Sequence, residues 1–190
     1  MNAYPGKRAF DLVVAGTACM VFAPVAAGVA VAVWLDDGRP LTFSQPRLGH
    51  ARHPFTILKF RSMRDQKVTR VGQWLRSTGV DELPQFLNVC RGEMSIVGPR
   101  PLTAQDVTRL GWNGPDHDWR FAARPGITGL SQLLAGGRGS RTSERLDRLY
   151  LRRQSPTLDL KLIALSFAAN LLGKRKIRRW LRASGAVSQA

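Results

Sequence analysis

An uncharged apolar run near the start of the chain, residues 12–35, constrains the fold more than any other feature. It reads LVVAGTACMVFAPVAAGVAVAVWL and lies between Lys7, Arg8 and Asp11 on one side and Asp36 and Asp37 on the other. At about 1.5 Å per residue, a helix over this run could cross a hydrocarbon core of about 30 Å. The run therefore predicts a protein attached to a membrane.

Three kinds of apolar segment compete for this run. A cleavable signal peptide is disfavoured, because the run is longer than the usual apolar region of about 7–15 residues. A plain transmembrane helix is opposed by Pro24, which kinks a helix, and by positive charge on both flanks. A re-entrant segment that breaks at Ala23 and Pro24 and returns to the same face accounts for both features. The charge rule is weak for long domains, so the residues alone leave re-entry and a full span open.

The net charge of +16 on 190 residues implies an anionic partner: nucleic acid, anionic lipid or a phosphorylated substrate. The apolar fraction of 44% and the charged fraction of 22% are ordinary for a folded chain, so disorder is excluded as the main state. The two cysteines include Cys19 within the apolar run, which makes a disulfide framework improbable and fits a reducing compartment.

The rest of the chain predicts short elements. Short β-type runs within residues 41–60, divided by prolines and glycine, predict a small β-hairpin or two short strands. Helices are expected over 68–78, 82–91 and 158–172, whereas 96–101 and 124–139 are rich in loop-forming residues. A basic stretch follows at 174–182, which indicates either binding to anionic lipid or a solvated helix end.

Asp81 and Glu82 stand at the expected start of the second helix. Carboxylates in a first helical turn often only stabilise the exposed N–H groups and the helix dipole, and that alternative applies here. Adjacent residues on a helix do not face each other, so the spacing does not imply a pair that shares a proton. Two carboxylates that point in different directions would more naturally perform two different tasks.

Several basic and histidine side chains are further candidates. Arg100 stands between Pro99 and Pro101 and could address a phosphate with two parallel hydrogen bonds, or it could lie in a surface turn. Lys59, Arg61 and Arg64 come close after a short strand, where alternation would put Lys59 and Arg61 on one face; the alternative is a solvated face. The pairs His50/His53 and Asp116/Asp118 could suggest metal sites, but neither pair has companions at ligand spacing.

These motifs together resemble the small monotopic phosphoglycosyl transferases, also called bacterial sugar transferases, which prime glycan assembly on polyprenyl phosphate. Each piece is weak alone, and their order and spacing over residues 7–170 are specific. The matching pieces are KRAFD at 7–11, KFRSM at 59–63, GQWLR at 72–76, DELPQ at 81–85, NV at 88–89, GEMS at 92–95, VGPRP at 97–101, RPGITG at 124–129 and LDLK at 158–161.

The resemblance implies a reaction and roles for named residues. A nucleotide diphosphate-sugar, usually a UDP-sugar, gives its sugar phosphate to polyprenyl (undecaprenyl) phosphate and releases UMP. Asp81 matches the nucleophile that forms an aspartyl-phosphosugar intermediate and binds the Mg²⁺ cofactor, and Glu82 would assist. Substrate phosphate or nucleotide binding falls to the matching residues Lys59, Arg76, Pro99, Arg100 and Arg124. Ala23 departs from the family, which often has serine before the proline of the helix break.

The expected architecture is α/β and mainly helical. A re-entrant helix-break-helix segment at 1–36 precedes a catalytic domain at 37–172 with a short β-hairpin and interfacial amphipathic helices, and a basic tail occupies 173–190. We expect the chain at the cytoplasmic face of a bacterial inner membrane, with nucleotide-sugar, polyprenyl phosphate and anionic lipids as partners. A homodimer stays open, and nucleic acid is not expected. The alternatives are a membrane-anchored nucleic-acid-binding protein and an inactive scaffold of the same fold.

Overall fold

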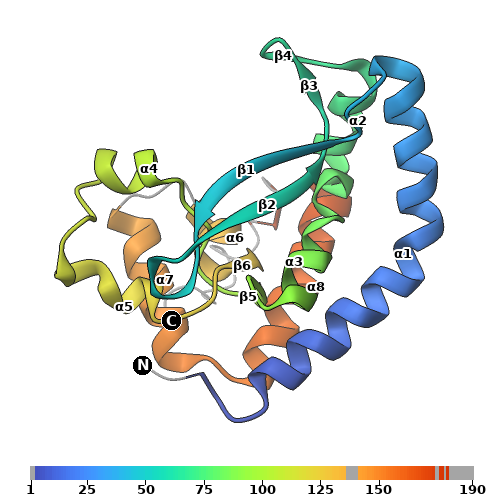
Figure 1. The fold of residues 1–190 in the computed structure, drawn as a ribbon. Coiled ribbons are helices and arrows are strands. Elements are labelled where there is room, and N and C mark those ends of the chain that lie inside the picture. Colours follow the sequence, from blue (N-terminus) through green and yellow to red (C-terminus); the bar gives the residue numbers. More distant parts are fainter. Residues whose placement is uncertain (1–2, 136–140, 174–175, 178, 180–190) are drawn as a thin grey trace.

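The computed structural model describes residues 3–135, 141–173, 176, 177 and 179, and Figure 1 shows their arrangement. Most of the basic stretch predicted at 174–182 lies outside these residues. The described helices are α1 Lys7–Asp37, α2 Arg70–Thr78, α3 Gln85–Arg91, α4 Ala104–Arg109, α5 Asp118–Phe121, α6 Leu130–Ala135, α7 Arg141–Arg153 and α8 Pro156–Leu172. The strands are β1 Thr42–Leu48, β2 Pro54–Phe60, β3 Met63–Arg64, β4 Lys67–Val68, β5 Ser95–Val97 and β6 Gly126–Thr128. The prediction of a mainly helical chain with small sheets is confirmed.

Helix α1 is one continuous helix with Pro24 inside it, so the chain does not break into two helices at Ala23 and Pro24 as predicted. Figure 1 shows that the two halves of α1 run in different directions, so the helix bends along its length. A proline inside a helix removes one hydrogen bond and bends the axis without ending the helix. Within the described residues, α1 is the one helix long and apolar enough to cross a membrane.

The buried residues of α1 lie near its two ends. Lys7, Asp11 and Ala15 are buried in the first part and Val29 and Val33 in the last part, whereas the middle of the helix is exposed. Only 11% of the most apolar stretch of α1 is buried, which excludes the interpretation of α1 as a core helix. Both ends of the helix therefore rest on the remainder of the chain, and its apolar middle is free to meet lipid.

Strands β1 and β2 form the predicted antiparallel hairpin, with Thr42 opposite Phe60 and Leu48 opposite Pro54. Side chains alternate between the two faces of a strand, so Phe55, Ile57 and Lys59 of β2 share one face. Phe55 and Ile57 are buried on that face. The hairpin thus presents Lys59 at the end of a face that is otherwise packed into the core.

Strands β5 and β6 pair in parallel, with Ser95 opposite Gly126 and Val97 opposite Thr128. A Cβ atom added at Gly126 would clash with the backbone at Gly98, so the close approach of the two strands requires glycine here. The sequence predicts only loop-like chain in these two segments. The parallel pair brings residues from 97–101 beside residues from 124–129.

Three hydrophobic clusters hold the fold together. The largest joins α1, the hairpin, α3, β5 and the last three helices; its buried members include Ala15, Phe55, Ile57, Val89, Met94, Ile96, Val97, Tyr150 and Leu162. A second cluster packs the end of α1 on α2 and contains Val29, Val33, Phe60 and Leu75. A third contains Leu102, Val107, Trp112 and Phe121. Each half of α1 therefore belongs to a different cluster.

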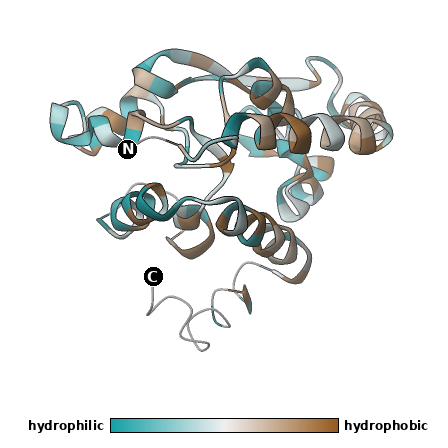
Figure 2. Cartoon of the chain, turned by 90° about the horizontal axis from the view of Figure 1, so that it is seen from below, coloured by the Kyte–Doolittle hydropathy of each residue, from teal (hydrophilic) through white to brown (hydrophobic). Residues whose placement is uncertain are grey.

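Helix α8 is apolar and leaves Leu160, Phe167 and Leu172 exposed. Figure 2 shows hydrophobic residues gathered along α1 and α8, whereas α7 is largely hydrophilic. Exposed apolar patches on a folded domain mark surfaces that meet a partner or a membrane. These two helices are therefore the parts of the described chain best suited to contact lipid.

Candidate active site

Asp81 lies in a tight turn between two helices. Helix α2 ends at Gly79, whose φ of 77° is left-handed, and a 3-10 turn at Val80–Glu82 follows directly. Glycine adopts this conformation without the steric cost that a side chain would add. The reversal places the Asp81 side chain inward, where the residue is 9% exposed, ahead of α3.

The Asp81 carboxylate is held among charges of both signs. Burial, and then the neighbouring Glu82 carboxylate, raise the pKa of Asp81 above its usual value, while Lys59 and Arg76 act in the opposite direction. Arg76 lies at the end of α2, where its Nε donates a hydrogen bond to Ser62 Oγ at 2.9 Å. A partly desolvated carboxylate beside two cations suits a group that must react with an anionic substrate.

Glu82 forms an ion pair with Lys59, with 2.5 Å between Oε1 and Nζ. Both side chains line a small cleft of about 20 Å³, about the space of one water molecule. The cleft is lined by Arg47, Ile57, Lys59, Glu82, Gln85, Arg100, Pro101, Gly126, Ile127 and Gln132. A substrate of any size must therefore move these side chains apart as it enters.

Arg100 is fixed through its backbone. Pro99 is buried and its carbonyl accepts a hydrogen bond from the Gly126 N–H at 2.9 Å, and the Arg100 carbonyl accepts one from Arg120 at 2.8 Å. No ion-pair partner of the Arg100 guanidinium is found among the described residues. The predicted site residues Lys59, Glu82 and Arg100 thus line one cleft. Pro99 does not line it but holds the backbone next to Arg100 through its hydrogen bond to Gly126.

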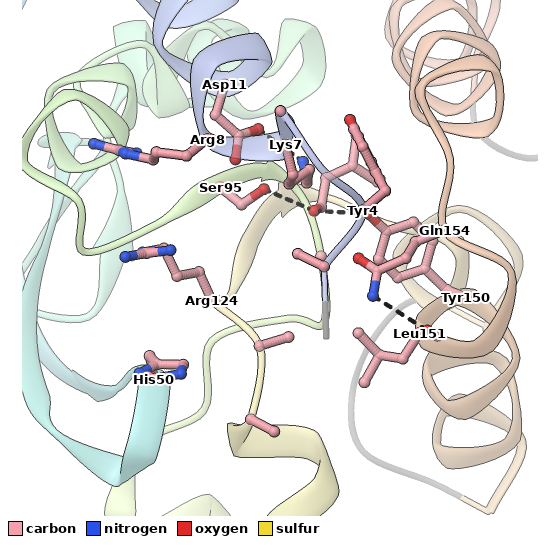
Figure 3. A pocket seen from close by; sticks show the side chains of 16 residues that line it. Tyr4, Lys7, Arg8, Asp11, His50, Ser95, Arg124, Tyr150, Leu151 and Gln154 are labelled. Atoms are coloured by element: carbon pink, nitrogen blue, oxygen red, sulfur yellow. Dashed lines mark hydrogen bonds and ion pairs between the residues drawn. The ribbon is translucent and has the colours of Figure 1, made fainter. Parts of the chain in front are cut away.

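The structure does not bring Arg124 to this cleft. Its Nε donates to the Gly92 carbonyl at 2.8 Å, just beyond the end of α3. Arg124 lines a separate cavity of about 430 Å³, where its side chain lies near Arg8 and His50 in Figure 3. Neither Asp81 nor Glu82 lines that cavity, whereas Glu82 lines the smaller cleft. The role of Arg124 in phosphate binding stays a prediction.

Three polar residues of the cleft were not among the predicted site residues: Arg47, Gln85 and Gln132. The hairpin register contains a signal for Arg47, because Arg47 pairs with Phe55 and so lies on the same face as Lys59. The register depends on which residues form the turn of the hairpin, and local sequence patterns did not predict those residues. Gln85 follows Pro84 at the start of α3, and helix periodicity does not indicate that its side chain lies in a cleft.

The carboxylates at the turn fit a magnesium ion. The described residues contain no group of three or more His, Cys, Asp or Glu side chains placed to hold a metal, and so neither His50/His53 nor Asp116/Asp118 forms such a group. Mg²⁺ commonly needs only one or two protein carboxylates, with substrate phosphates and water completing its shell. Asp81 beside Glu82, next to a cation-lined cleft, is a donor set of that kind.

Comparison with known proteins supports a single family. Residues 2–173 match the family described as bacterial sugar transferase. An undecaprenyl-phosphate glucose phosphotransferase of Komagataeibacter xylinus is 37% identical over 88% of this chain and 36% of that protein. A UDP-glucose:undecaprenyl-phosphate glucose-1-phosphate transferase of Caulobacter vibrioides is 38% identical over 83% of this chain and 66% of that protein.

The chain thus spans between about a third and two thirds of the length of these two relatives. A shorter relative is matched almost completely. The exopolysaccharide production protein PSS of Rhizobium leguminosarum bv. phaseoli is 36% identical over 83% of this chain and 90% of that protein. The order of motifs, the geometry around Asp81 and these similarities agree, and the chain belongs to the bacterial sugar transferase family.

Proposed function

We propose that this protein is a phosphoglycosyl transferase that moves a sugar 1-phosphate from a UDP-sugar to undecaprenyl phosphate and releases UMP. One observation carries the proposal: the buried Asp81 carboxylate is acted on by the Lys59 and Arg76 charges, and its neighbour Glu82 lines a cleft that also contains Arg47, Lys59 and Arg100. The relatives from Komagataeibacter and Caulobacter are named for this type of transfer. Such a reaction would be the first membrane step in assembly of a bacterial glycan.

Asp81 is the nucleophile of the proposed reaction. Its carboxylate oxygen forms a bond to the phosphorus that bears the sugar, and the bond from that phosphorus to the bridging oxygen breaks, so UMP leaves with the electron pair. An oxygen of the lipid phosphate then attacks the same phosphorus and expels Asp81. The two displacements replace one difficult transfer by two easier ones and regenerate the free carboxylate.

The surrounding charges act on the phosphates. Lys59, Arg76 and Arg100 stabilise the negative charge that develops as the phosphorus changes partners. Bound Mg²⁺, held by Asp81, would neutralise the diphosphate. Glu82 keeps the Lys59 ammonium at the mouth of the cleft through their ion pair. Arg76 is oriented by its hydrogen bond to Ser62, and its charge acts on Asp81.

The proposed acceptor places the protein at a membrane. Both ends of α1 pack on one catalytic domain, which supports a helix that enters the bilayer and returns to the same face. The UDP-sugar is supplied from the cytoplasm, so we assign the domain to the cytoplasmic face of the inner membrane. Helix α8 and amphipathic helices such as α2 would lie at the interface, where anionic lipids attract the basic surface.

Replacing Asp81 by Asn tests this function. UMP release from UDP-glucose and related UDP-sugars is measured with detergent-solubilised protein and undecaprenyl phosphate, with and without EDTA. We expect Asp81→Asn to abolish release while the protein still sediments with membranes, and EDTA to abolish release by the unchanged protein. Asp118→Asn, which makes the same change at an exposed position, should retain activity. Full activity of Asp81→Asn would refute the covalent mechanism.

A further inference from the structure

Two buried donors of the cleft have no partner among the residues that the structure describes. Gln85 is 2% exposed, and its Nε2 forms no hydrogen bond. Arg47 lies at the same cleft, and its buried Nε is also unpaired. Buried donors are nearly always satisfied in folded proteins, so two open donors at one cleft indicate a ligand that accepts hydrogen bonds.

The charge of the cleft shows which acceptor is expected. Lys59 and Glu82 neutralise each other, which leaves Arg47 and Arg100 facing the same space. The carboxylate nearest Arg47 is Asp106, at 3.6 Å, and Asp106 forms a shorter contact of 3.0 Å with Arg109. Arg47 also donates to the Pro101 carbonyl at 3.3 Å and to Gln45 Oε1 at 2.5 Å, and both of these acceptors are uncharged. Two arginines at one cleft, with only this longer carboxylate contact among the described residues to balance their charge, favour an anion, and a phosphate accepts the paired hydrogen bonds that a guanidinium donates.

The position of Lys59 indicates which of the two phosphates of the substrate lies at the cleft. Lys59 acts on Asp81 and also lines the cleft, whereas Arg76 acts on Asp81 and does not line the cleft. The phosphorus attacked by Asp81 therefore lies near Lys59 and Arg76. The second phosphate of a nucleotide diphosphate-sugar is adjacent to it, and the cleft that Lys59 lines is where its charge would be met.

We propose that Arg47 and Gln85 bind the phosphate that leaves with the nucleoside, on the side of the cleft that Arg100 completes. This assignment rests on the proposed function. The phosphate of the lipid acceptor has the same chemistry, but no residue of α1 or α8 lines the cleft. A lipid tail would therefore lack the exposed apolar side chains that those two helices provide, so the nucleotide is the better occupant.

Arg47→Met in the full-length protein tests this assignment. We expect the KM for the UDP-sugar to rise about tenfold or more, because a charge-assisted hydrogen bond is lost, while the KM for undecaprenyl phosphate stays within about twofold. Arg109→Met is the matched control, because Arg109 pairs with the same Asp106 carboxylate but does not line the cleft. A rise confined to the KM for the lipid phosphate would overturn the assignment.

A binding measurement separates this inference from the proposed function. The affinities for UMP and for uridine, which lacks the phosphate, are compared by calorimetry in detergent. We expect Arg47→Met to lose most of the preference for UMP, and Gln85→Met and Arg47→Lys to lose part of it. These milder variants decide the question if Arg47→Met fails to fold, and an unchanged preference in both would then overturn the inference.

The two failures are distinguishable. If the unchanged protein transfers sugar phosphate and the Arg47 and Gln85 variants bind UMP as it does, only the assignment of these residues is wrong. The unchanged protein could instead bind UMP more tightly than uridine, lose this preference in Arg47→Met, and release no UMP from any UDP-sugar. The assignment of Arg47 to a phosphate would then be right and the proposed transfer reaction wrong. If the unchanged protein neither transfers nor distinguishes UMP from uridine, both are wrong.

Discussion

At the scale of single residues, the ion pair between Arg120 and Asp147 supports the cleft without lining it. Both residues are almost fully buried, and Arg120 Nη2 lies 3.1 Å from Asp147 Oδ2. The same guanidinium donates to the Arg100 carbonyl. Burial raises the pKa of Asp147, and Arg120 opposes that shift. The pair thus holds the backbone from which Arg100 reaches the cleft.

Removing one partner of this pair should be costly. Asp147→Asn leaves Arg120 buried without its counter-charge, and we expect the free energy of unfolding to fall by about 3–5 kcal/mol. Chemical denaturation in detergent measures the change. The control is Asp118→Asn, which breaks an exposed pair with Arg52 and should cost at most about 1 kcal/mol. Equal losses in the two variants would contradict a structural role specific to the buried pair.

At the scale of elements, α3 is held at the end away from Asp81. Arg8 donates to the carbonyls of Val89 and Cys90 at 2.8 and 3.1 Å, and Arg124 donates to the Gly92 carbonyl at 2.8 Å. Cations stabilise the carboxyl end of a helix because its last carbonyls lack partners. The two arginines thus tie α1 and the segment before β6 to the helix that follows the turn at Val80–Glu82.

Because of this arrangement, experiments can distinguish the role of Arg124 from that of Arg100. Arg124→Met should lower the free energy of unfolding by about 1 kcal/mol, because one helix-end hydrogen bond is lost, with little change in the KM for the UDP-sugar. Arg100→Met should raise that KM with little change in stability. Thermal denaturation and steady-state kinetics on both variants give the comparison. A large rise in KM for Arg124→Met would instead support the phosphate-binding role that the resemblance implies.

Local sequence patterns predicted the elements whose signal is local. The hairpin within 41–60, the helix before Gly79 and the apolar helix before Gly173 all appear close to their expected positions. Strands β5 and β6 were not predicted, because each has three residues and they pair across a long intervening segment. Contacts between distant parts of the chain also explain why part of the cleft was not predicted. Motifs identified Asp81 and Arg100, but Arg47 and Gln85 join them only through tertiary packing.

At the scale of the whole molecule, α1 is fastened at both ends by ion pairs. Lys7 bridges Asp11 and Asp159 at 2.7 and 2.9 Å near the start. Arg61 binds Asp37 at 2.8 Å near the end. Both ends of the helix thus contact the remainder of the same domain, and the re-entrant path stays a prediction.

Labelling of single cysteines tests the path of α1. Cys19 and Cys90 are first replaced by Ser, and Ala3→Cys or Arg39→Cys is introduced. We expect neither position to react with a membrane-impermeant maleimide in spheroplasts, and both to react after the membrane is permeabilised. Reaction of position 39 alone in intact spheroplasts would mean that the segment spans the bilayer and would refute re-entry.

The contacts at the two ends of α1 also have a consequence for how the protein folds. Ala15 fills one hydrophobic cluster and Val33 another, and Lys7 neutralises the fully buried Asp159. A chain that lacks the first 36 residues would expose both clusters and leave Asp159 without this cation. The apolar helix is thus a structural component of the domain as well as its attachment. We therefore expect completion of the domain to accompany insertion of α1 into a bilayer, and a chain trimmed of α1 not to yield a folded, water-soluble protein.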